Sequence, residues 1–310
     1  MTVSRRLAKP FLRALGVLLG AETVTFAAYH LLPGDPAEVS LGVPNPSAEL
    51  VATTRHEMGL DRPLAVQYVV FLGRLLRGDL GTSYQLHEPV TRVLREQVWA
   101  TVTLAVAALA IAFAVSVPLA VATAGRRPAM RGLSSGGELL LTSSPSFWIG
   151  ILLLSLFSFR LGWFPVISGT SVRGLVLPAV TLAVSIIGVL TQVLRDGLER
   201  ALDEPFTVSA RARGTGETMV RLRHGLRHAL IPLLTVSGWI LGALLGGTVV
   251  VETVFSRQGL GRIAATAITS RDLPTVTGVV LVSALVFCVL NLVIDVLYRV
   301  VDPRLRTATA

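Results

Sequence analysis

Stretches of about twenty residues that are almost free of charge recur along this chain, and they constrain its fold more than any other feature. A helix rises 1.5 Å per residue, so a stretch of this length crosses a hydrocarbon core of about 30 Å. Hydrophobic residues make up 52% of the 310 residues and charged residues only 15%, whereas soluble domains carry about 25% charged residues. The chain is therefore predicted to be an all-α integral membrane protein.

The apolar stretches predict six transmembrane helices. They are expected over residues 11–32, 100–124, 138–159, 175–194, 229–251 and 278–300. The first is expected to be an uncleaved span, because its apolar run is longer than that of a typical secretory signal peptide and further spans follow. An even number of crossings places both termini on the same side of the membrane.

The net charge of +9 comes almost entirely from arginine, which collects in alternate connections between the predicted helices. The basic connections are the N-terminus, residues 125–132, residues 195–228 and the C-terminal tail. The positive-inside rule places these in the cytoplasm, so both termini are expected there. The remaining connections are residues 33–99, 160–174 and 252–277, and they are expected outside. Charges are nearly balanced in the first and third of these, and the second carries only two charged residues, both arginines. In a soluble protein such a basic charge would suggest nucleic-acid binding. Here its distribution between alternate connections indicates the topology of the chain in the membrane.

The segment after the first predicted helix is too long for a turn and too polar for lipid. Within it, residues 64–76 place apolar side chains at near-helical spacing and predict an amphipathic helix on the membrane surface. The predicted organisation therefore has four parts. These are the N-terminus with the first helix (1–32), an outer segment (33–99), a transmembrane core with a cytoplasmic loop at 195–228 (100–302) and a tail (303–310).

The loop between the fourth and fifth predicted helices carries the most informative pattern. Met219, Leu222 and Leu226 recur at i, i+3 and i+7, which predicts a short amphipathic helix beneath the membrane. Gly214 and Gly216 come before it and predict a turn at which one short helix ends and another begins. The pattern alone favours a plain solvated, lipid-facing connector.

Residues 209–232, SARARGTGETMVRLRHGLRHALIP, resemble the cytoplasmic motif of ABC importer permeases, in the variant typical of the dipeptide, oligopeptide and nickel group. Val208 stands where a glutamate usually opens the motif, and the spacing from Gly214 to Pro232 is longer than usual. Both departures resemble what the peptide and nickel group shows.

Other stretches resemble the same group, in the same order, along nearly the whole chain. They are HLLPGDPAEVSLG, GLDRPLAVQYVVFLGRLLRGDLGTSY, SSPSFWIGILLL, FRLGWFPVISG, GGTVVVETVFSRQGLGR and DVLYRVVDPRLR. The GDP and DPR elements resemble the first permease of a pair and not the second.

The resemblance implies the type I ABC importer permease fold and a set of partners. These are a homologous second permease, two separate ATPase subunits that bind ATP and magnesium, and an extracytoplasmic solute-binding protein. The implied location is the bacterial cytoplasmic membrane, and the implied substrate is a dipeptide, an oligopeptide, nickel or a metal chelate. Because the sequence has no GxxxxGK(S/T) motif, this chain is expected not to bind ATP in that way. The resemblance implies a transport subunit and not an enzyme, with no cofactor bound by this chain.

In that family the cytoplasmic motif forms the coupling helix, which docks into a cleft on the ATPase. The resemblance implies that Arg211, Arg213 and Glu217 make polar contacts at that surface. The full set of predicted coupling residues is Ser209, Ala210, Arg211, Ala212, Arg213, Gly214, Glu217, Arg221 and Leu222.

Polar residues inside the predicted helices are candidates for the translocation path. Glu22 lies near the middle of the first helix, where a carboxylate costs several kcal/mol unless it is paired, protonated or facing water. It could meet a cationic part of a substrate, or it could be a protonated contact between helices. Ser143, Ser146 and Thr248 could line the path or only permit close helix packing.

No metal site is predicted from the remaining candidate ligands. Cys288 is the only cysteine and lies in an apolar stretch, where it is expected to be a small buried hydrophobe. His224 and His228 are one helical turn apart, but the sequence offers no third ligand near them.

Two other functions stay open. An ion-coupled secondary transporter would have the same spans, although such carriers usually hold charged relays in the bundle and often show an inverted repeat. An intramembrane enzyme would need a base beside Ser143 or Ser144, and no serine or cysteine hydrolase motif is recognisable.

Overall fold

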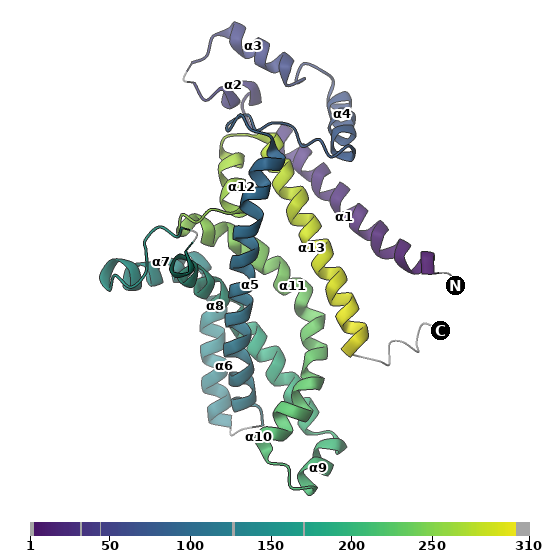
Figure 1. Cartoon of the computed structure of the whole chain (residues 1–310), viewed down its shortest axis with the longest axis vertical. Helices are drawn as coiled ribbons and strands as arrows, with labels where there is room; N and C mark the ends of the chain where they lie inside the picture. The colour runs from purple at the N-terminus through teal and green to yellow at the C-terminus, as the bar shows by residue number, and fades with distance from the viewer. Residues whose placement is uncertain (1–2, 32, 44, 126–127, 170, 302–310) are drawn as a thin grey trace. The chain divides into compact units, whose positions relative to one another are not determined.

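A computed structural model describes the backbone of residues 3–31, 33–43, 45–125, 128–169 and 171–301 (Figure 1). Over these residues the regular elements are helices, with one isolated bridge between Thr82 and Pro89. Contacts divide the chain into two compact units, Met1–Thr101 with Gln258–Cys288 and Val102–Arg257 with Val289–Ala310. This division follows contacts and not sides of a membrane, so the four parts expected from the sequence stay predictions.

Four helical stretches are long and apolar enough to cross a membrane. They are Leu12–Leu31, Val90–Thr123, Val172–Leu202 and Leu273–Val296, and they correspond to the first, second, fourth and sixth predicted helices. A bent helix pair raises the number to five. In the fifth predicted helix only Gly238–Val254 counts as a shorter apolar stretch. The all-helical fold is thus confirmed for the described chain, while six crossings stay a prediction.

The third predicted helix, residues 138–159, differs from the expected continuous span. Helix α6 (Pro128–Ser143) is followed by α7 (Ser146–Leu153), which continues into the π-helix η1 (Leu154–Arg160). The two parts are bent by 96° at the break between them. Pro145 has extended ψ at that point, and a proline disfavours helical geometry in the residue before it. The apolar composition predicted a membrane segment but not its bend.

The first unit contains the helices on either side of the outer segment. They are α1 (Val3–Leu31), α2 (Pro36–Leu41), α3 (Ala48–Glu57), α4 (Leu64–Leu76), the start of α5 (Val90–Thr123), α12 (Leu260–Thr269) and the start of α13 (Leu273–Val301). A small core forms where Val90 and Leu94 meet Leu260 and Val279. Helix α4 has the bounds predicted for the amphipathic helix, and it contains no buried residue.

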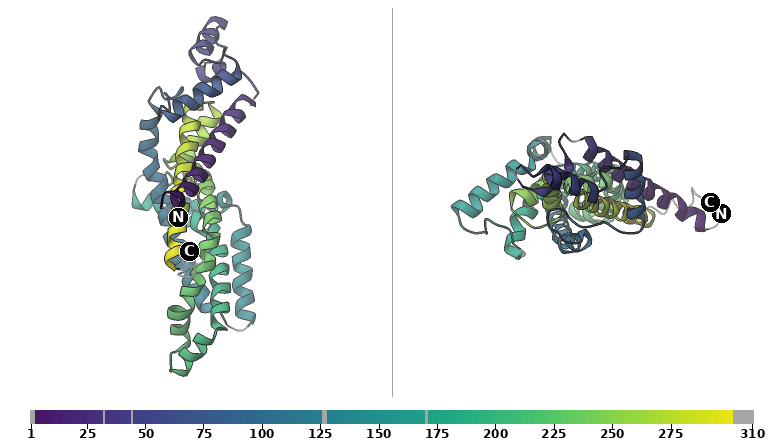
Figure 2. Two further views of the ribbon diagram at one scale, coloured as in Figure 1. Left: turned by 90° about the vertical axis from the view of Figure 1, so that its right-hand side faces the viewer. Right: turned by 90° about the horizontal axis from the view of Figure 1, so that it is seen from above.

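The second unit is built around α8 (Val172–Leu202), which lies beside α6 and α11 (Leu226–Val254) (Figures 1 and 2). Its remaining elements are α9 (Pro205–Ala212), α10 (Glu217–Met219) and the π-helix η2 (Val220–Gly225). Fully buried Ile186, Leu190, Leu194 and Leu198 form one stripe along α8, the pattern of a helix face in a core. Gly197 allows α11 to approach closely, since a Cβ there would lie 2.8 Å from Ala229 Cα.

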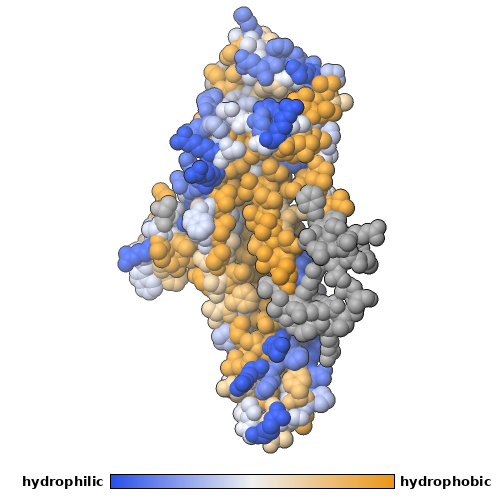
Figure 3. Space-filling view, turned by 45° about the vertical axis from the view of Figure 1, so that its right-hand side comes forward, coloured by the Kyte–Doolittle hydropathy of each residue, from blue (hydrophilic) through white to orange (hydrophobic). Residues whose placement is uncertain are grey.

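Two of the long apolar helices are scarcely covered by the rest of the chain. Only 11% of the span in α1 and 6% of that in α13 is buried. Exposed side chains on α13 include Leu285, Val289 and Leu292. Such apolar surfaces require lipid or another apolar subunit. Figure 3 shows hydrophobic residues over much of the visible face.

Candidate coupling site

The loop after α8 folds back against the end of that helix. Glu204 is extended, and Pro205 opens α9 as its first residue, a position where the missing proline N–H leaves no bond unmade. The Thr207 hydroxyl lies 2.8 Å from the Leu202 carbonyl and 2.7 Å from the Glu204 carbonyl, to which it donates. These contacts satisfy acceptors at the C-terminus of α8. Helix α9 therefore starts in a fixed orientation.

A left-handed turn separates α9 from α10. Gly214 has a φ of +81°, a conformation that favours glycine, whereas Gly216 has a φ of −63° and caps α10. Across this turn Arg211 Nε donates to Glu217 Oε1 over 2.7 Å. The predicted change from one short helix to another is confirmed, and the ion pair adds a fastening that the spacing did not indicate.

The helix that begins at α10 turns Met219 and Leu222 outward and Arg221 inward. Met219 is 52% exposed and Leu222 is 45% exposed, whereas Val220 and Arg221 are buried. Arg221 Nη1 donates to the Val121 carbonyl over 3.3 Å, in the last turn of α5. A cation is favourable there because the C-terminal end of a helix is negative. Periodicity predicted the two faces but not which of them lies inside.

The predicted coupling residues differ in their exposure. Ala210 and Arg221 are buried within the chain, and Arg211 is half-buried. The exposed members are Ser209, Ala212, Arg213, Gly214, Glu217 and Leu222. Hydrophilic side chains gather around this end of the second unit (Figure 3). Docking stays a prediction, and the exposed members are those placed to meet a partner without rearrangement.

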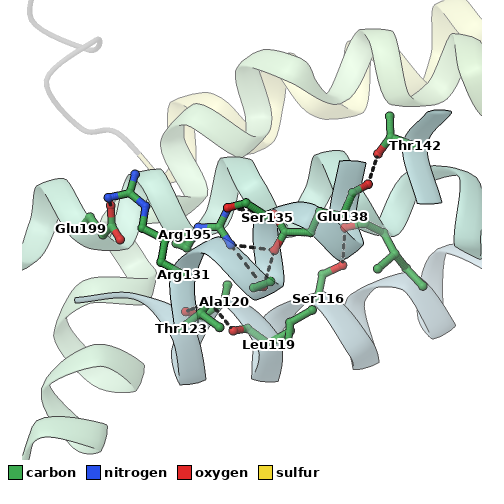
Figure 4. Close-up of polar contacts among 12 residues, drawn as sticks. Ser116, Leu119, Ala120, Thr123, Arg131, Ser135, Glu138, Thr142, Arg195 and Glu199 are labelled. Carbon is green, nitrogen blue, oxygen red and sulfur yellow. Dashed lines mark hydrogen bonds and ion pairs between the residues drawn. The ribbon is translucent and has the colours of Figure 1, made fainter. Parts of the chain in front are cut away.

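A buried ion pair joins α6 to α8 before the loop begins (Figure 4). Arg195 donates from Nη1 to Glu138 Oε1 over 2.6 Å and from Nη2 to Oε2 over 2.7 Å. The two side chains are only 3% and 6% exposed. The hydroxyls of Ser134 and Ser135 accept further bonds from the guanidinium, at 3.3 and 3.2 Å. A bidentate contact of this kind fixes the direction of both charged groups.

This ion pair was not predicted, because its two partners lie in separate predicted elements. Glu138 began the third predicted helix and Arg195 began the cytoplasmic loop, 57 residues later. The available signal was the opposite charge at the cytoplasmic ends of two consecutive predicted helices. A second pair, Arg131 with Glu199, joins the same helices at 3.2 Å and is 52% and 24% exposed (Figure 4).

The predicted path residues lie in different settings. Ser143 ends α6 and Ser146 begins α7, so the two serines flank the 96° break. The Thr248 hydroxyl is buried and donates to the Leu245 carbonyl over 2.8 Å, within α11. Glu22, in the first unit, is 0% exposed, and neither carboxylate oxygen has a hydrogen-bond partner among the described residues. Their role in a path stays a prediction.

One of the two loop histidines is engaged in another way. The ring of His228 stacks on Phe206 with centroids 4.7 Å apart. In the part of the chain that the structure describes, no three His, Cys, Asp or Glu side chains form a group that could hold a metal ion. Cys288 is half-buried and free in the structure.

Long apolar helices, a broken membrane segment and a folded loop at the end of a bundle define a multi-pass helical membrane protein. Residues 114–307 match the family described as the binding-protein-dependent transport system inner membrane component. Residues 3–105 match the N-terminal part of the same class of membrane component. The chain therefore belongs to this family of transport permeases.

Two relatives extend over nearly the whole chain. The glutathione transport system permease protein of Salmonella typhimurium is 37% identical over 303 residues, which are 96% of this chain and 97% of that protein. A putative peptide transport system permease protein of Brucella abortus is 39% identical over 304 residues, with 95% and 96% covered. The resemblance found in the sequence is confirmed: the chain is a membrane permease of the ABC importer type.

Proposed function

We propose that this chain forms, with a homologous second permease, the path by which an ATP-driven importer carries small peptides inward. The observation that supports this most directly is the exposed pair Met219 and Leu222 beside the turn that Arg211 and Glu217 fasten. An apolar projection surrounded by charged residues is typical of a protein-interaction surface. Its proposed partners are two ATPase subunits, which bind ATP and magnesium, while this chain binds no cofactor.

The proposed arrangement in the bacterial cytoplasmic membrane has six crossings and both termini inside. Four crossings are the long apolar helices. The broken pair formed by α6 and α7 with η1 provides one more, and α11 provides the sixth. Arginine-rich connections on one side support this orientation.

A small peptide is the proposed substrate, delivered by an extracytoplasmic binding protein to the outer connections. The family description supports the binding protein. Both relatives are named for glutathione or peptide transport, which favours a peptide over nickel or a metal chelate.

Glu22 is the proposed acid of the path, and a cationic group of the substrate is its proposed partner. It is fully buried, and its two oxygens have no hydrogen-bond partner in the described chain. Such a carboxylate is costly within a membrane, which supports a functional role over a packing role. The Glu22→Gln variant should assemble normally and change the preference for cationic peptides. Unchanged transport of each cationic peptide tested, with normal assembly, would refute this role.

An ion-coupled carrier is the alternative function. Membership in a binding-protein-dependent family argues against it. Transport can be measured in proteoliposomes with ATP on the side of the membrane that corresponds to the cytoplasm. If transport requires this ATP and persists when ion gradients are collapsed, an ion-coupled carrier is excluded. Transport driven by an ion gradient without ATP would overturn the proposal.

Recovery of partners from detergent-solubilised membranes tests the coupling site directly. Wild-type chain should bring down a second permease and ATPases, whereas Gly214→Pro should lose the ATPases, because proline cannot adopt a φ of +81°. Gly216→Pro is the matched control, since its φ of −63° suits proline. If the wild-type chain is recovered alone, or if both variants retain the ATPases, the coupling assignment is wrong.

A further inference from the structure

Helices α6 and α8 are joined in a way that leaves no room for sliding. The buried Glu138–Arg195 pair holds them by two short bonds. Gly188 precedes Arg195 in α8, and a Cβ added to it would lie 2.6 Å from the backbone oxygen of Glu138. Only a glycine allows the backbones of α6 and α8 to approach this closely. A shift of one helix along the other would break the ion pair where little water can replace it.

The same two helices connect the coupling loop to the broken membrane segment. Helix α8 leads into the loop, and Thr207 fastens α9 to its last turn. Helix α6 ends at Ser143, directly before the bend at Pro145. A firm joint between α6 and α8 thus provides a mechanical connection from the loop to the bend.

We propose that Glu138 and Arg195 are positioning residues that keep α6 and α8 a single rigid body throughout transport. A displacement of the coupling loop then moves α6, and the bend with it. A buried charge that loses its partner is strongly unfavourable, so this pair stays closed in every state. The exposed Arg131–Glu199 pair exchanges readily with water and contributes little. The inference depends on the proposed function, because it assumes that the loop is displaced by an ATPase.

A covalent link between α6 and α8 tests the rigid body. Arg131→Cys and Glu199→Cys are introduced into a Cys288→Ala background, in which they are the only cysteines of the chain. The assembled complex is reconstituted with ATPases and binding protein, and the two thiols are joined by a short bifunctional maleimide. Transport should stay within about twofold of that after a monofunctional maleimide, because helices that already move together lose no motion when they are linked, and the exposed ion pair that was replaced contributes little. Loss of transport after efficient linking would mean that the helices must separate.

Removal of one charge at a time tests the role of the buried pair. Glu138→Gln and Arg195→Gln should lower the peptide transported per ATP hydrolysed by about tenfold or more, because the remaining charge lacks its partner and the joint loosens. Glu199→Gln is the control on the exposed pair and should leave this ratio unchanged. If the pair had a purely structural role, the variants would show less assembled protein and lower peptide transport and ATP hydrolysis together. The peptide transported per ATP hydrolysed would then be unchanged, and this result would overturn the inference.

The two proposals fail in different ways. If the parent Cys288→Ala complex shows no ATP-driven uptake, the proposed function is wrong. If the parent transports but linking abolishes uptake, the function holds and the rigid body is refuted. Poor assembly of the glutamine variants leaves the linking experiment decisive, since it keeps Glu138 and Arg195 in place.

Discussion

The cytoplasmic loop after α8 and the outer segment after α1 both connect long helices, but they are fastened by opposite means. In the loop, buried Arg221 reaches inward to the end of α5, and apolar Met219 and Leu222 are left exposed. In the outer segment, polar clamps are contributed by the turn between α12 and α13. The first arrangement produces an apolar projection, and the second lies beside a cleft lined by both polar and apolar side chains.

Arg271 is the first of these clamps. It adopts a left-handed conformation with a φ of +55°, which costs a non-glycine residue about 1 kcal/mol. Its guanidinium donates to the Gly34 carbonyl over 3.0 Å and also to the Pro33 carbonyl. It therefore holds the point at which the chain leaves α1.

Asp272 is the second clamp and is only 2% exposed. It accepts bonds from the Ser83 hydroxyl, from the Tyr84 backbone N–H at 3.1 Å and from the Thr275 hydroxyl at 2.7 Å. Burial raises the pKa of Tyr84, and the charge of Asp272 adds to this effect. Adjacent residues thus hold the start of the outer segment and the stretch shortly before α5.

Beside these clamps lies an open cleft of about 550 Å³. Its lining includes aromatic side chains together with His30, Arg74 and Asp79. An open cleft of mixed lining suits reversible contact, since its charged groups stay hydrated when it is unoccupied. A rigid apolar projection suits the transmission of movement. On the proposed function, the outer segment receives and the loop transmits.

The largest effect is expected at the outer clamp. Asp272→Ala leaves the buried Ser83 hydroxyl and the Tyr84 N–H without their acceptor, which costs about 3 kcal/mol. The thermal midpoint of the detergent-purified complex should fall clearly. Asp79→Ala, at an exposed ion pair with Arg74, is the control and should change it little. Equal midpoints for the two variants would show that the outer segment is not held at Asp272.

The next effect should appear in partner binding and not in stability. Leu222→Asp places a charge on the exposed projection and should weaken ATPase binding by about 2 kcal/mol, or roughly thirtyfold. The thermal midpoint of the free chain should not move, because Leu222 is 45% exposed. Leu64→Asp, on α4 of the outer segment and 59% exposed, should leave the affinity unchanged. If both variants lost the same ATPase affinity, the cytoplasmic loop would be no more important for ATPase binding than the outer segment, and the proposed difference between them would be wrong.

Local patterns predicted some of these features well. The apolar periodicity of residues 64–76 predicted α4, and the two glycines after α9 predicted the turn. The helix and the turn each depend on residues that lie within a few positions of one another, so the local sequence is enough to predict them. The family resemblance then predicted an interface at the loop, which periodicity alone left open and which stays a prediction.

Features that depend on distant partners escaped prediction. The Glu138–Arg195 pair joins residues 57 positions apart, and Asp272 meets Ser83 across 189 positions. The inward direction of Arg221 depends on the end of α5, 100 residues away. The bend at Pro145 was locally encoded, but a continuous apolar composition concealed it. Charge and proline positions near predicted helix ends were the signals to use.

A smaller effect should separate strain from hydrogen bonding at the first clamp. Arg271→Ala and Arg271→Gly both remove the bonds to Pro33 and Gly34, but only glycine relaxes at a φ of +55°. The glycine variant should therefore be more stable than the alanine variant by about 1 kcal/mol. Thermal midpoints of the two purified complexes measure this difference. An alanine variant as stable as the glycine variant would mean that the left-handed turn is absent.

The smallest effect should come from the ion pair across the loop turn. Arg211→Gln removes the ion pair with Glu217. The Arg211 side chain is 37% exposed and that of Glu217 is 53% exposed, and exposed pairs of this kind contribute about 0.5 kcal/mol. Because salt screens exposed charges, the difference from wild type should vanish near 1 M salt. Arg221→Gln removes a buried donor to Val121 and should lower the thermal midpoint at any ionic strength. If the Arg211 effect persists in salt while the Arg221 effect disappears, the inner and outer faces of the loop are reversed.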